Sequence, residues 1–222
     1  MEKLLLASNS PRRKALFALF GWQFDVKPAD VDETQQPAET PVAYVERLAC
    51  EKAAAMAQTV TGWVIGADTI VVDEGSLLGK PENPEDAQRM LWQLRGRVHQ
   101  VYTGIAMVNQ ELGQSYHSVC CTHVPMRDYS DEEIDAYIAT GDPMDKAGAY
   151  AIQHAGFHPV ADMQGCYASV MGLPLCHLMV GFEQMGMDVP GDMPAKCQVY
   201  LGYDCPVSEQ ILASAKGTTG GC

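Results

Sequence analysis

The chain has 222 residues, of which 47% are apolar and 19% are charged. This balance supplies enough apolar side chains for a folded core and argues against a disordered protein. No apolar run approaches the roughly 18–20 residues that cross a bilayer, so a membrane partner is not expected. The net charge of −13 disfavours a broad nucleic-acid-binding surface. A small polyanion can still bind where the few basic residues converge.

Capping residues and hydrophobic periodicity predict strands and helices that alternate along the chain. Polar N-cap residues at positions 10, 40 and 83 are each followed by a proline, and Ser130 opens a capping box. The predicted helices cover 11–20, 41–58, 84–96, 130–140 and 173–185. The predicted strands cover 3–6, 23–27, 63–72, 98–109 and 116–125, with short candidates at 149–152, 160–163 and 167–170. This order predicts an α/β fold, a mixed sheet with flanking helices.

The end of the chain differs from the rest in composition. Residues 188–222 are rich in glycine and proline and end in a Thr-Thr-Gly-Gly-Cys sequence. We therefore predict one domain over residues 1–187 and an appended, partly mobile tail over residues 188–222. A thiol or metal role for the tail through Cys197, Cys205 and Cys222 is the weaker interpretation, because their spacing matches no recognised metal motif.

The eight cysteines contain no CxxC pair and follow no recognisable export signal. This pattern favours reduced thiols in a protein of the cytoplasm, most of them acting as small core residues. His154 and His158 are four residues apart, but the stretch between them has the composition of a loop. A zinc site is therefore not expected there.

Residues 7–13 (ASNSPRR) lie between a predicted strand and the N-terminus of a predicted helix. Free backbone N–H groups and the helix dipole make such a junction an anion site. Arginine matches phosphate oxygens bidentately, and hydroxyl groups add donors. The side chains concerned are those of Ser8, Ser10, Arg12 and Arg13. The alternative is a capped helix with two surface arginines, since the P-loop pattern GxxxxGK[ST] is absent.

Two charged residues stand in apolar surroundings. Lys52 falls within the apolar stripe of the predicted helix 41–58, so it either reaches out at the helix end or extends into a site. Asp68 lies in the apolar run 63–72, where burial and nearby cations would tune its pKa. The alternative is that the strand ends at Ala67 and Asp68 stands in a turn. Gly66 allows another group to approach the backbone closely.

Two further segments carry weaker signals. Pro81 holds Lys80 extended in the sequence Gly-Lys-Pro. Residues 146–153 (KAGAYAIQ) leave room for a flat ligand, and Gln153 offers both a donor and an acceptor. Each segment alone is equally compatible with a surface loop.

Taken together and in this order, these segments resemble the Maf family of nucleoside triphosphate pyrophosphatases. The resemblance covers roughly residues 3–185. It rests on residues 6–13 (LASNSPRR), 47–53 (RLACEKA), 66–69 (GADT), 79–81 (GKP) and 146–153 (KAGAYAIQ), with 165–167 (GCY) and 172–175 (GLPL). The tail after residue 187 departs from the family pattern.

The resemblance implies a Maf/Ham fold related to inosine-triphosphate pyrophosphatases, with two lobes around a cleft, usually as a homodimer. It implies hydrolysis of a nucleoside triphosphate to the monophosphate and pyrophosphate with a divalent cation, Mg²⁺ or Mn²⁺. Asp68 would accept the proton of the attacking water. Glu33, in the acidic loop 28–40, is interpreted as a metal ligand together with Asp68, because Mg²⁺ prefers oxygen ligands. The implied phosphate-binding residues are Ser8, Ser10, Arg12, Arg13, Lys52 and Lys80.

Within the family, the sequence looks like the branch that acts on dTTP and UTP, with modified pyrimidine nucleoside triphosphates as further candidate substrates. The positions that resemble its specificity determinants are Arg12, Arg13, Thr69 and Gln153. The alternatives are a pyrophosphatase for 7-methyl-GTP, or a non-catalytic nucleotide-binding regulator of cell division or septum formation. The presence of Asp68 beside Lys52 and Lys80 favours an enzyme, because a pure binder needs no base near the phosphates.

Overall fold

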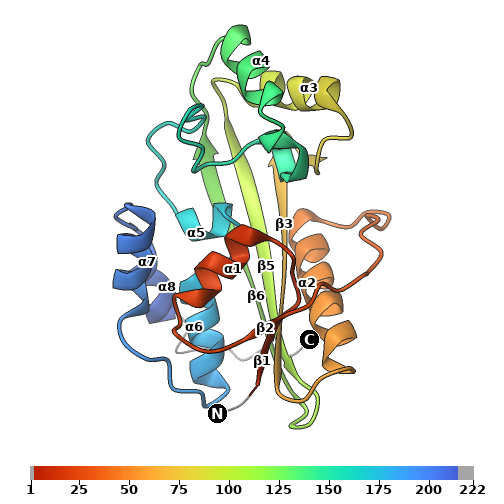
Figure 1. Cartoon of the computed structure of the whole chain (residues 1–222), viewed down its shortest axis with the longest axis vertical. Helices are drawn as coiled ribbons and strands as arrows, with labels where there is room; N and C mark the ends of the chain where they lie inside the picture. The colour runs from red at the N-terminus through yellow and green to blue at the C-terminus, as the bar shows by residue number, and fades with distance from the viewer. Residues whose placement is uncertain (1–2, 215–222) are drawn as a thin grey trace.

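The computed structural model describes residues 3–214, in which six strands form one mixed sheet (Figure 1). The strand order is β2-β1-β3-β5-β6, and β4 pairs with β3. β1 runs parallel to β2 and β3, whereas β3 is antiparallel to β4 and β5, and β5 to β6. The strands are β1 (Leu4–Leu6), β2 (Asp25–Val26), β3 (Trp63–Asp73), β4 (Ser76–Leu78), β5 (Val98–Asn109) and β6 (Gln114–Pro125). The predicted mixed α/β sheet is confirmed.

The helices begin where the capping residues predict. The side chains of Ser10, Thr40 and Asn83 each accept the backbone N–H three residues later, and a proline fills the first helical position. Ser130 and Glu133 form the predicted capping box. The helices are α1 (Pro11–Ala18), α2 (Pro41–Ala57), α3 (Pro84–Leu94), α4 (Asp131–Ala139), α5 (Tyr167–Val170), α6 (Leu175–Gln184), α7 (Met193–Leu201) and α8 (Ser208–Ser214), with 3₁₀ turns η1 (Asp142–Asp145) and η2 (Ala147–Ala149).

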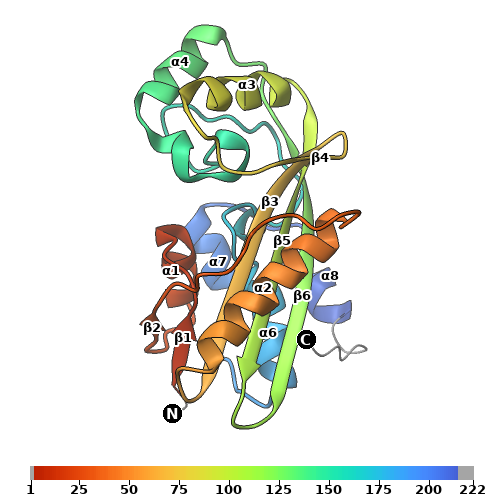
Figure 2. The same ribbon diagram turned by 90° about the vertical axis from the view of Figure 1, so that its right-hand side faces the viewer.

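Helices cover both faces of the sheet (Figure 2). Successive side chains of a strand point to opposite faces, so neighbouring residues of β1 enter different cores. Leu5 packs in a cluster with Ala53 of α2, whereas Leu6 packs in the cluster that contains Phe17 of α1. The sheet is therefore buried on both sides, which explains the continuous apolar sequence of β3.

The long strands β3, β5 and β6 run through two lobes (Figures 1 and 2). One lobe contains α3, α4 and β4, and the other contains α1, α2 and α6. Among residues 3–214, the helices lack the length and hydropathy needed to cross a membrane.

The three short strand candidates are not strands in the structure. Gly148 (φ 69°) and Ala149 (φ 60°) turn the chain with left-handed backbone angles just before 150–152, which continue as loop. Val160 forms only an isolated bridge with Met126, and residues 167–170 form helix α5. The apolar, partly β-branched composition of these stretches reflects burial rather than strand pairing.

Residues 188–214 are ordered against the core and do not form the mobile tail that their composition predicts. Met193 of α7 is fully buried, and α7 and α8 both contact α6. The Tyr203 hydroxyl accepts the Gly165 N–H (3.2 Å) and lies 3.0 Å from the Met163 carbonyl oxygen. Cys222 lies outside the described residues. The boundary at residue 187 falls in the loop before α7, and the division into domain and tail stays a prediction.

Candidate active site

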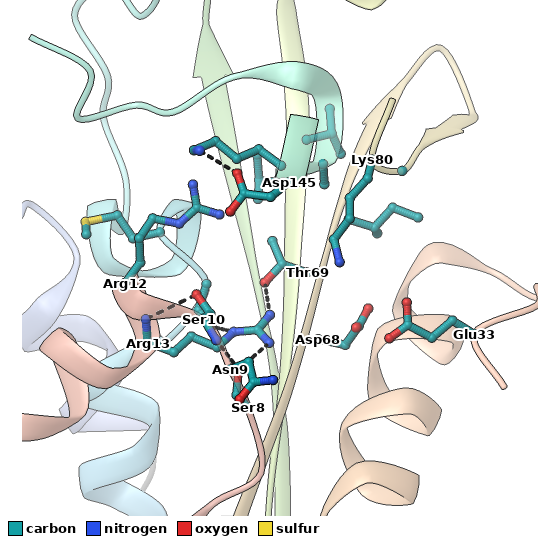
Figure 3. A pocket seen from close by; sticks show the side chains of 18 of the residues that line it. Ser8, Asn9, Ser10, Arg12, Arg13, Glu33, Asp68, Thr69, Lys80 and Asp145 are labelled. Atoms are coloured by element: carbon teal, nitrogen blue, oxygen red, sulfur yellow. Dashed lines mark hydrogen bonds and ion pairs between the residues drawn. The ribbon is translucent and has the colours of Figure 1, made fainter. Parts of the chain in front are cut away.

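An open cavity of about 520 Å³ lies where the two lobes meet (Figure 3). Its walls include the loop after β1, the start of α1, the acidic loop 28–40, α2, β3, the loop after β4, η2 and the end of α5. These segments are far apart in the sequence, and the sheet brings them together. The predicted residues that line the cavity are Ser8, Ser10, Arg12, Arg13, Glu33, Lys52, Asp68, Thr69 and Lys80.

A gap along one edge of β3 creates the position of Asp68. β1 pairs with β3 only as far as Ile65, and β4 pairs with β3 only from Val71 onward. Between them the edge of β3 is open, and Asp68 lies within this open stretch. The strand continues to Asp73, so the alternative in which Asp68 stands in a turn is excluded.

Close packing of α2 on the sheet brings a lysine to this carboxylate. A side chain at Gly66 would place its Cβ 2.2 Å from the Ala49 carbonyl oxygen, and one at Gly104 would lie 2.3 Å from the Val45 carbonyl oxygen. Both glycines thus allow the helix to approach the sheet at short range. The group that approaches Gly66 is α2 itself, which carries Lys52 toward the cavity.

Lys52 joins two carboxylates at the cavity wall. Its Nζ donates to Asp68 Oδ1 at 2.7 Å and lies 2.5 Å from Glu33 Oε1. The side chains of Lys52 and Asp68 are 10% and 11% exposed, whereas Glu33 is 53% exposed. Lys52 therefore extends into the site, which resolves the two alternatives left by its position in the apolar stripe.

The two carboxylates differ in their affinity for a proton. Burial raises the pKa of Asp68, although the charges of Lys52 and Arg13 oppose this shift. For Glu33, burial acts in the same direction but the hydrogen bond and charge of Lys52 prevail, so its pKa lies below the usual value. Asp68 is accordingly the stronger base of the pair.

Arg13 is held by the protein itself. Its Nη1 donates to the Ala67 carbonyl oxygen at 2.9 Å, in the open stretch of β3, and its Nε donates to the Gly172 carbonyl oxygen at 2.9 Å. Nη2 donates to Thr69 Oγ1 at 3.1 Å, and Ser8 Oγ lies 3.4 Å from Nη1. Arg13 thus takes the place of a strand partner at the gap in the sheet edge.

The hydroxyl groups behind Arg13 form a chain with a defined direction. Thr103 Oγ1 donates its only proton to the Ser169 carbonyl oxygen at 2.8 Å. It must therefore accept at 3.0 Å from Thr69 Oγ1, which in turn accepts from Arg13. The Thr69 hydroxyl donates its only proton to Thr103, so it can only accept a hydrogen bond from a ligand.

Two cations of the cavity have no partner in the described part of the chain. Arg12 is half-buried, Lys80 is exposed, and neither side chain forms a hydrogen bond or ion pair with residues 3–214. Figure 3 shows Arg12 across the cavity from Glu33, with Lys80 on the Glu33 side. The loop of Lys80 is fixed by the Gly148 N–H, which donates to the Gly79 carbonyl oxygen at 3.0 Å. Both free cations can bind an anionic ligand.

Comparison with known sequences identifies the family. A profile of the family described as "Maf-like protein" matches residues 3–185. The dTTP/UTP pyrophosphatase of Moorella thermoacetica is 46% identical over 192 residues, which cover 86% of this chain and 99% of that protein. The chain belongs to the Maf family. The resemblance inferred from the motifs is thereby confirmed.

Other relatives of this Maf protein carry the same name. The dTTP/UTP pyrophosphatase of Geobacter sulfurreducens is 46% identical over 189 residues, covering 84% of this chain and 99% of that protein. The one from Shewanella denitrificans is 49% identical over 180 residues, covering 77% and 90%. Among solved structures, a HAM1 protein from Coxiella burnetii is 14% identical, with a TM-score of 0.47 and coverage of 97% of this chain and 99% of that one.

One predicted residue of the Maf chain lies away from the cavity. Gln153 is exposed in the loop after Ile152 and is not among the residues that line the cavity. The backbone is left-handed at Gly148 and Ala149, between the cavity-lining Ala147 and Tyr150, and the chain leaves the cavity after Tyr150. Sequence spacing alone does not reveal this change of direction.

Several residues of the Maf site escaped the sequence analysis. Tyr44 lines the cavity and donates to the Glu33 carbonyl oxygen at 2.7 Å. Arg47 lies in the matched segment 47–53, and its main partner is Glu39, with N–O distances of 2.7 and 2.9 Å. Thr103 is buried in β5. The only signal for Thr103 was a polar residue within an apolar strand.

The carboxylates of the Maf site suit a divalent cation that is shared with the substrate. In residues 3–214, no three His, Cys, Asp or Glu side chains are grouped as a metal site. Glu33 and Asp68 converge on Lys52, so two carboxylate groups face the cavity. Mg²⁺ is commonly held by one or two carboxylates and completed by phosphate oxygens and water. The donor set therefore fits a cation that arrives with a phosphate-bearing ligand.

Proposed function

We propose that this protein hydrolyses dTTP and UTP to the monophosphate and pyrophosphate. The observation that carries the proposal is the buried Asp68, a base of raised pKa in a cavity lined by Arg12, Lys52 and Lys80. Hydrolysis at the α-phosphorus needs a positioned base for water and positive charge for the phosphates. The names of the relatives described above support the same substrates.

In this proposal Asp68 accepts the proton of the attacking water. A carboxylate whose pKa is raised by burial is a better base than an ordinary one, and the contact with Lys52 fixes its orientation. Positioned general bases contribute about 10²–10⁴ to the rate. Lys52 contacts only Oδ1 of Asp68, so the second carboxylate oxygen stays available to water.

The phosphates are assigned mainly to the unpaired groups of the cavity. Arg12 and Lys80 are free to form ion pairs, and Ser8 and Ser10 lie at the N-terminus of α1, where the helix dipole favours an anion. Lys52 contributes its charge while it stays paired with the carboxylates. We assign Arg13 a different role from the predicted one, because each of its three guanidinium nitrogens already donates to a carbonyl or hydroxyl oxygen of the protein.

Glu33 and Asp68 are the proposed ligands of a divalent cation, Mg²⁺ or Mn²⁺. When bound, this cation neutralises charge that develops on the phosphate oxygens. The chain itself contributes the two carboxylates and Lys52, which keeps them from repelling each other in the absence of the cation. The proposal therefore includes a strict requirement for a divalent ion.

Recognition of the pyrimidine base is assigned to Arg12 and Thr69. Both line the cavity, and the Thr69 hydroxyl presents an acceptor to the cavity because its proton points to Thr103. Such an acceptor matches the N3–H of uracil or thymine. Gln153 is not part of this assignment, since its side chain is exposed outside the cavity.

A nucleotide panel tests the proposal. The purified protein is incubated with pyrimidine, purine and 7-methyl-GTP substrates, with and without Mg²⁺, and phosphate and pyrophosphate are assayed separately. We expect pyrophosphate from UTP and dTTP only when the cation is present. Orthophosphate as the first product, or nucleotide binding without turnover, would favour another reaction or the regulatory alternative.

The proposal extends to location and assembly. We place the enzyme in the cytoplasm, where its nucleotide substrates are made, and propose that it works as a homodimer without a nucleic-acid or membrane partner. Light scattering coupled to size-exclusion chromatography checks the assembly, because a dimer would have twice the mass of the chain.

A further inference from the structure

The acidic loop that carries Glu33 has no regular structure of its own. Residues 27–40 contain no helix or strand, and the Glu33 side chain is half exposed. An unanchored loop of this length would sample many conformations, and fixing each residue costs backbone entropy. The Glu33 carboxylate nevertheless reaches Lys52 (Figure 3 shows it turned toward Asp68). Other contacts must hold the loop.

Two side chains of α2 bind two successive carbonyl groups of this loop. The Tyr44 hydroxyl donates to the Glu33 carbonyl oxygen at 2.7 Å, and Arg47 Nη2 donates to the Thr34 carbonyl oxygen at 3.2 Å. The Arg47 guanidinium carbon also lies 5.6 Å from the centre of the Tyr44 ring. The two side chains therefore form one unit on α2, the helix that also carries Lys52.

Arg47 is itself fixed at the far end of the loop. Its Nε and Nη2 bind the two carboxylate oxygens of Glu39 at 2.7 and 2.9 Å, in the bidentate geometry that arginine favours. The side chains are 18% and 7% exposed, so water competes little for this pair. Nη1 also contacts Glu51 at 3.3 Å. Arg47 thus links the loop at both Thr34 and Glu39 to α2.

The geometry points to Tyr44 and Arg47 as positioning residues that hold the Glu33 carboxylate beside Lys52 and Asp68. They act through the backbone of Glu33 and Thr34, and neither side chain forms a hydrogen bond or ion pair with Asp68. This inference rests on the proposed function, in which Glu33 binds the divalent cation. Its consequence is that loss of either anchor weakens cation binding through Glu33.

The test uses Tyr44→Phe in the full chain, which removes only the hydroxyl and keeps the ring beside Arg47. A hydrogen bond of this kind contributes about 0.5–1.5 kcal/mol, so Mn²⁺ should bind roughly 2–10-fold more weakly in the presence of a non-hydrolysable UTP analogue. Electron paramagnetic resonance measures free Mn²⁺ without any turnover. The matched control is Tyr200→Phe on α7, whose side chain is 48% exposed and should bind Mn²⁺ as the wild type does.

A second measurement reports on the loop directly. Amide hydrogen exchange over residues 28–40 should become faster in Tyr44→Phe and in Arg47→Lys, because a lysine cannot reach Glu39 and Thr34 together. The Tyr200→Phe control should exchange at the wild-type rate. Unchanged exchange in both anchor variants would overturn the inference.

A double-mutant cycle separates positioning from general structural damage. Mn²⁺ binding of Tyr44→Phe is compared in the wild-type and the Glu33→Gln backgrounds. If Tyr44 acts through Glu33, its replacement should have no further effect once Glu33 is gone. An equal loss in both backgrounds would contradict this role. Failure of the proposed function is a separate result, visible as a wild-type protein that releases no pyrophosphate from any nucleotide.

Discussion

The inner wall of the cavity and its rim use similar residues in opposite ways. The inner wall consists of Arg13, Lys52, Asp68 and Thr69, which are all bound to other groups of the protein. The rim consists of Arg12 and Lys80, which have no hydrogen-bond or ion-pair partner within residues 3–214. Arg12 and Arg13 are adjacent in sequence, yet only one is free. The difference indicates that the contacts of the inner wall exist before a ligand binds, whereas the side chains of the rim are free to pair with the ligand.

The largest expected effect comes from the base of the inner wall. Asp68→Asn keeps the shape of the side chain but removes the proton acceptor, so turnover should fall by about 10²–10⁴. Nucleotide binding should persist, because Arg12 and Lys80 are unchanged. Steady-state rates and calorimetric binding of a non-hydrolysable analogue measure the two effects. Near wild-type turnover would show that another group is the base.

Replacement of the fixed arginine should affect folding before it affects binding. Arg13→Lys keeps the charge but cannot bind Ala67, Thr69 and Gly172 together, which leaves buried acceptors unpaired. We expect the free energy of unfolding to fall by about 1–3 kcal/mol, measured by urea denaturation. Arg12→Lys is the control and should unfold like the wild type. A stable Arg13→Lys variant with a raised KM would instead place Arg13 on the substrate.

The rim should show the reverse pattern. Lys80→Ala should raise KM for UTP roughly tenfold, since a charge-assisted contact contributes about 1.5 kcal/mol. The free energy of unfolding should stay within about 0.5 kcal/mol of the wild type, because the exposed side chain supports nothing else. Paired kinetic and denaturation measurements check both. Loss of stability without a change in KM would show that Lys80 supports the fold and does not bind the nucleotide.

The smallest effect is expected outside both regions. Gln153→Ala should change turnover and the preference for UTP over purine nucleotides by less than about twofold, as for an ordinary surface substitution. Competition between UTP and GTP measures this preference. A marked loss of preference would mean that the loop of Gln153 moves to the base when nucleotide binds.

A pH profile connects the inner wall to its electrostatics. Burial raises the pKa of Asp68, so lowering the pH protonates this base sooner than an ordinary aspartate. Activity should therefore decline on the acid side at a higher pH than the usual carboxyl range. Lys52→Met removes a charge that opposes the shift, and the acid limb should move further upward in pH. An unchanged profile would show that the charge of Lys52 does not influence the ionisation of Asp68.

The sequence predicted those features that local chemistry determines. Lys52 was notable because it interrupts an apolar helical stripe, and Asp68 because it interrupts an apolar strand; both lie at the cavity. Capping residues predict the helix starts because a cap bonds to a backbone N–H only three residues away, which is also local chemistry.

The remaining features depend on contacts between distant segments. The gap between β1 and β4 along β3 arises from two separate pairings, and it leaves open the Ala67 carbonyl that Arg13, not Arg12, binds. Adjacent arginines look the same in sequence. The loop anchors Tyr44 and Arg47 were missed for a similar reason, because their partners lie in a loop without periodicity.

The central claim is that water, activated by Asp68, attacks the α-phosphorus of a pyrimidine nucleoside triphosphate. Hydrolysis of UTP in water enriched in ¹⁸O tests it most directly, with the products analysed by mass spectrometry. The account predicts one ¹⁸O atom in the monophosphate and none in the pyrophosphate. Label in the pyrophosphate, or a nucleoside diphosphate with labelled orthophosphate, would contradict it.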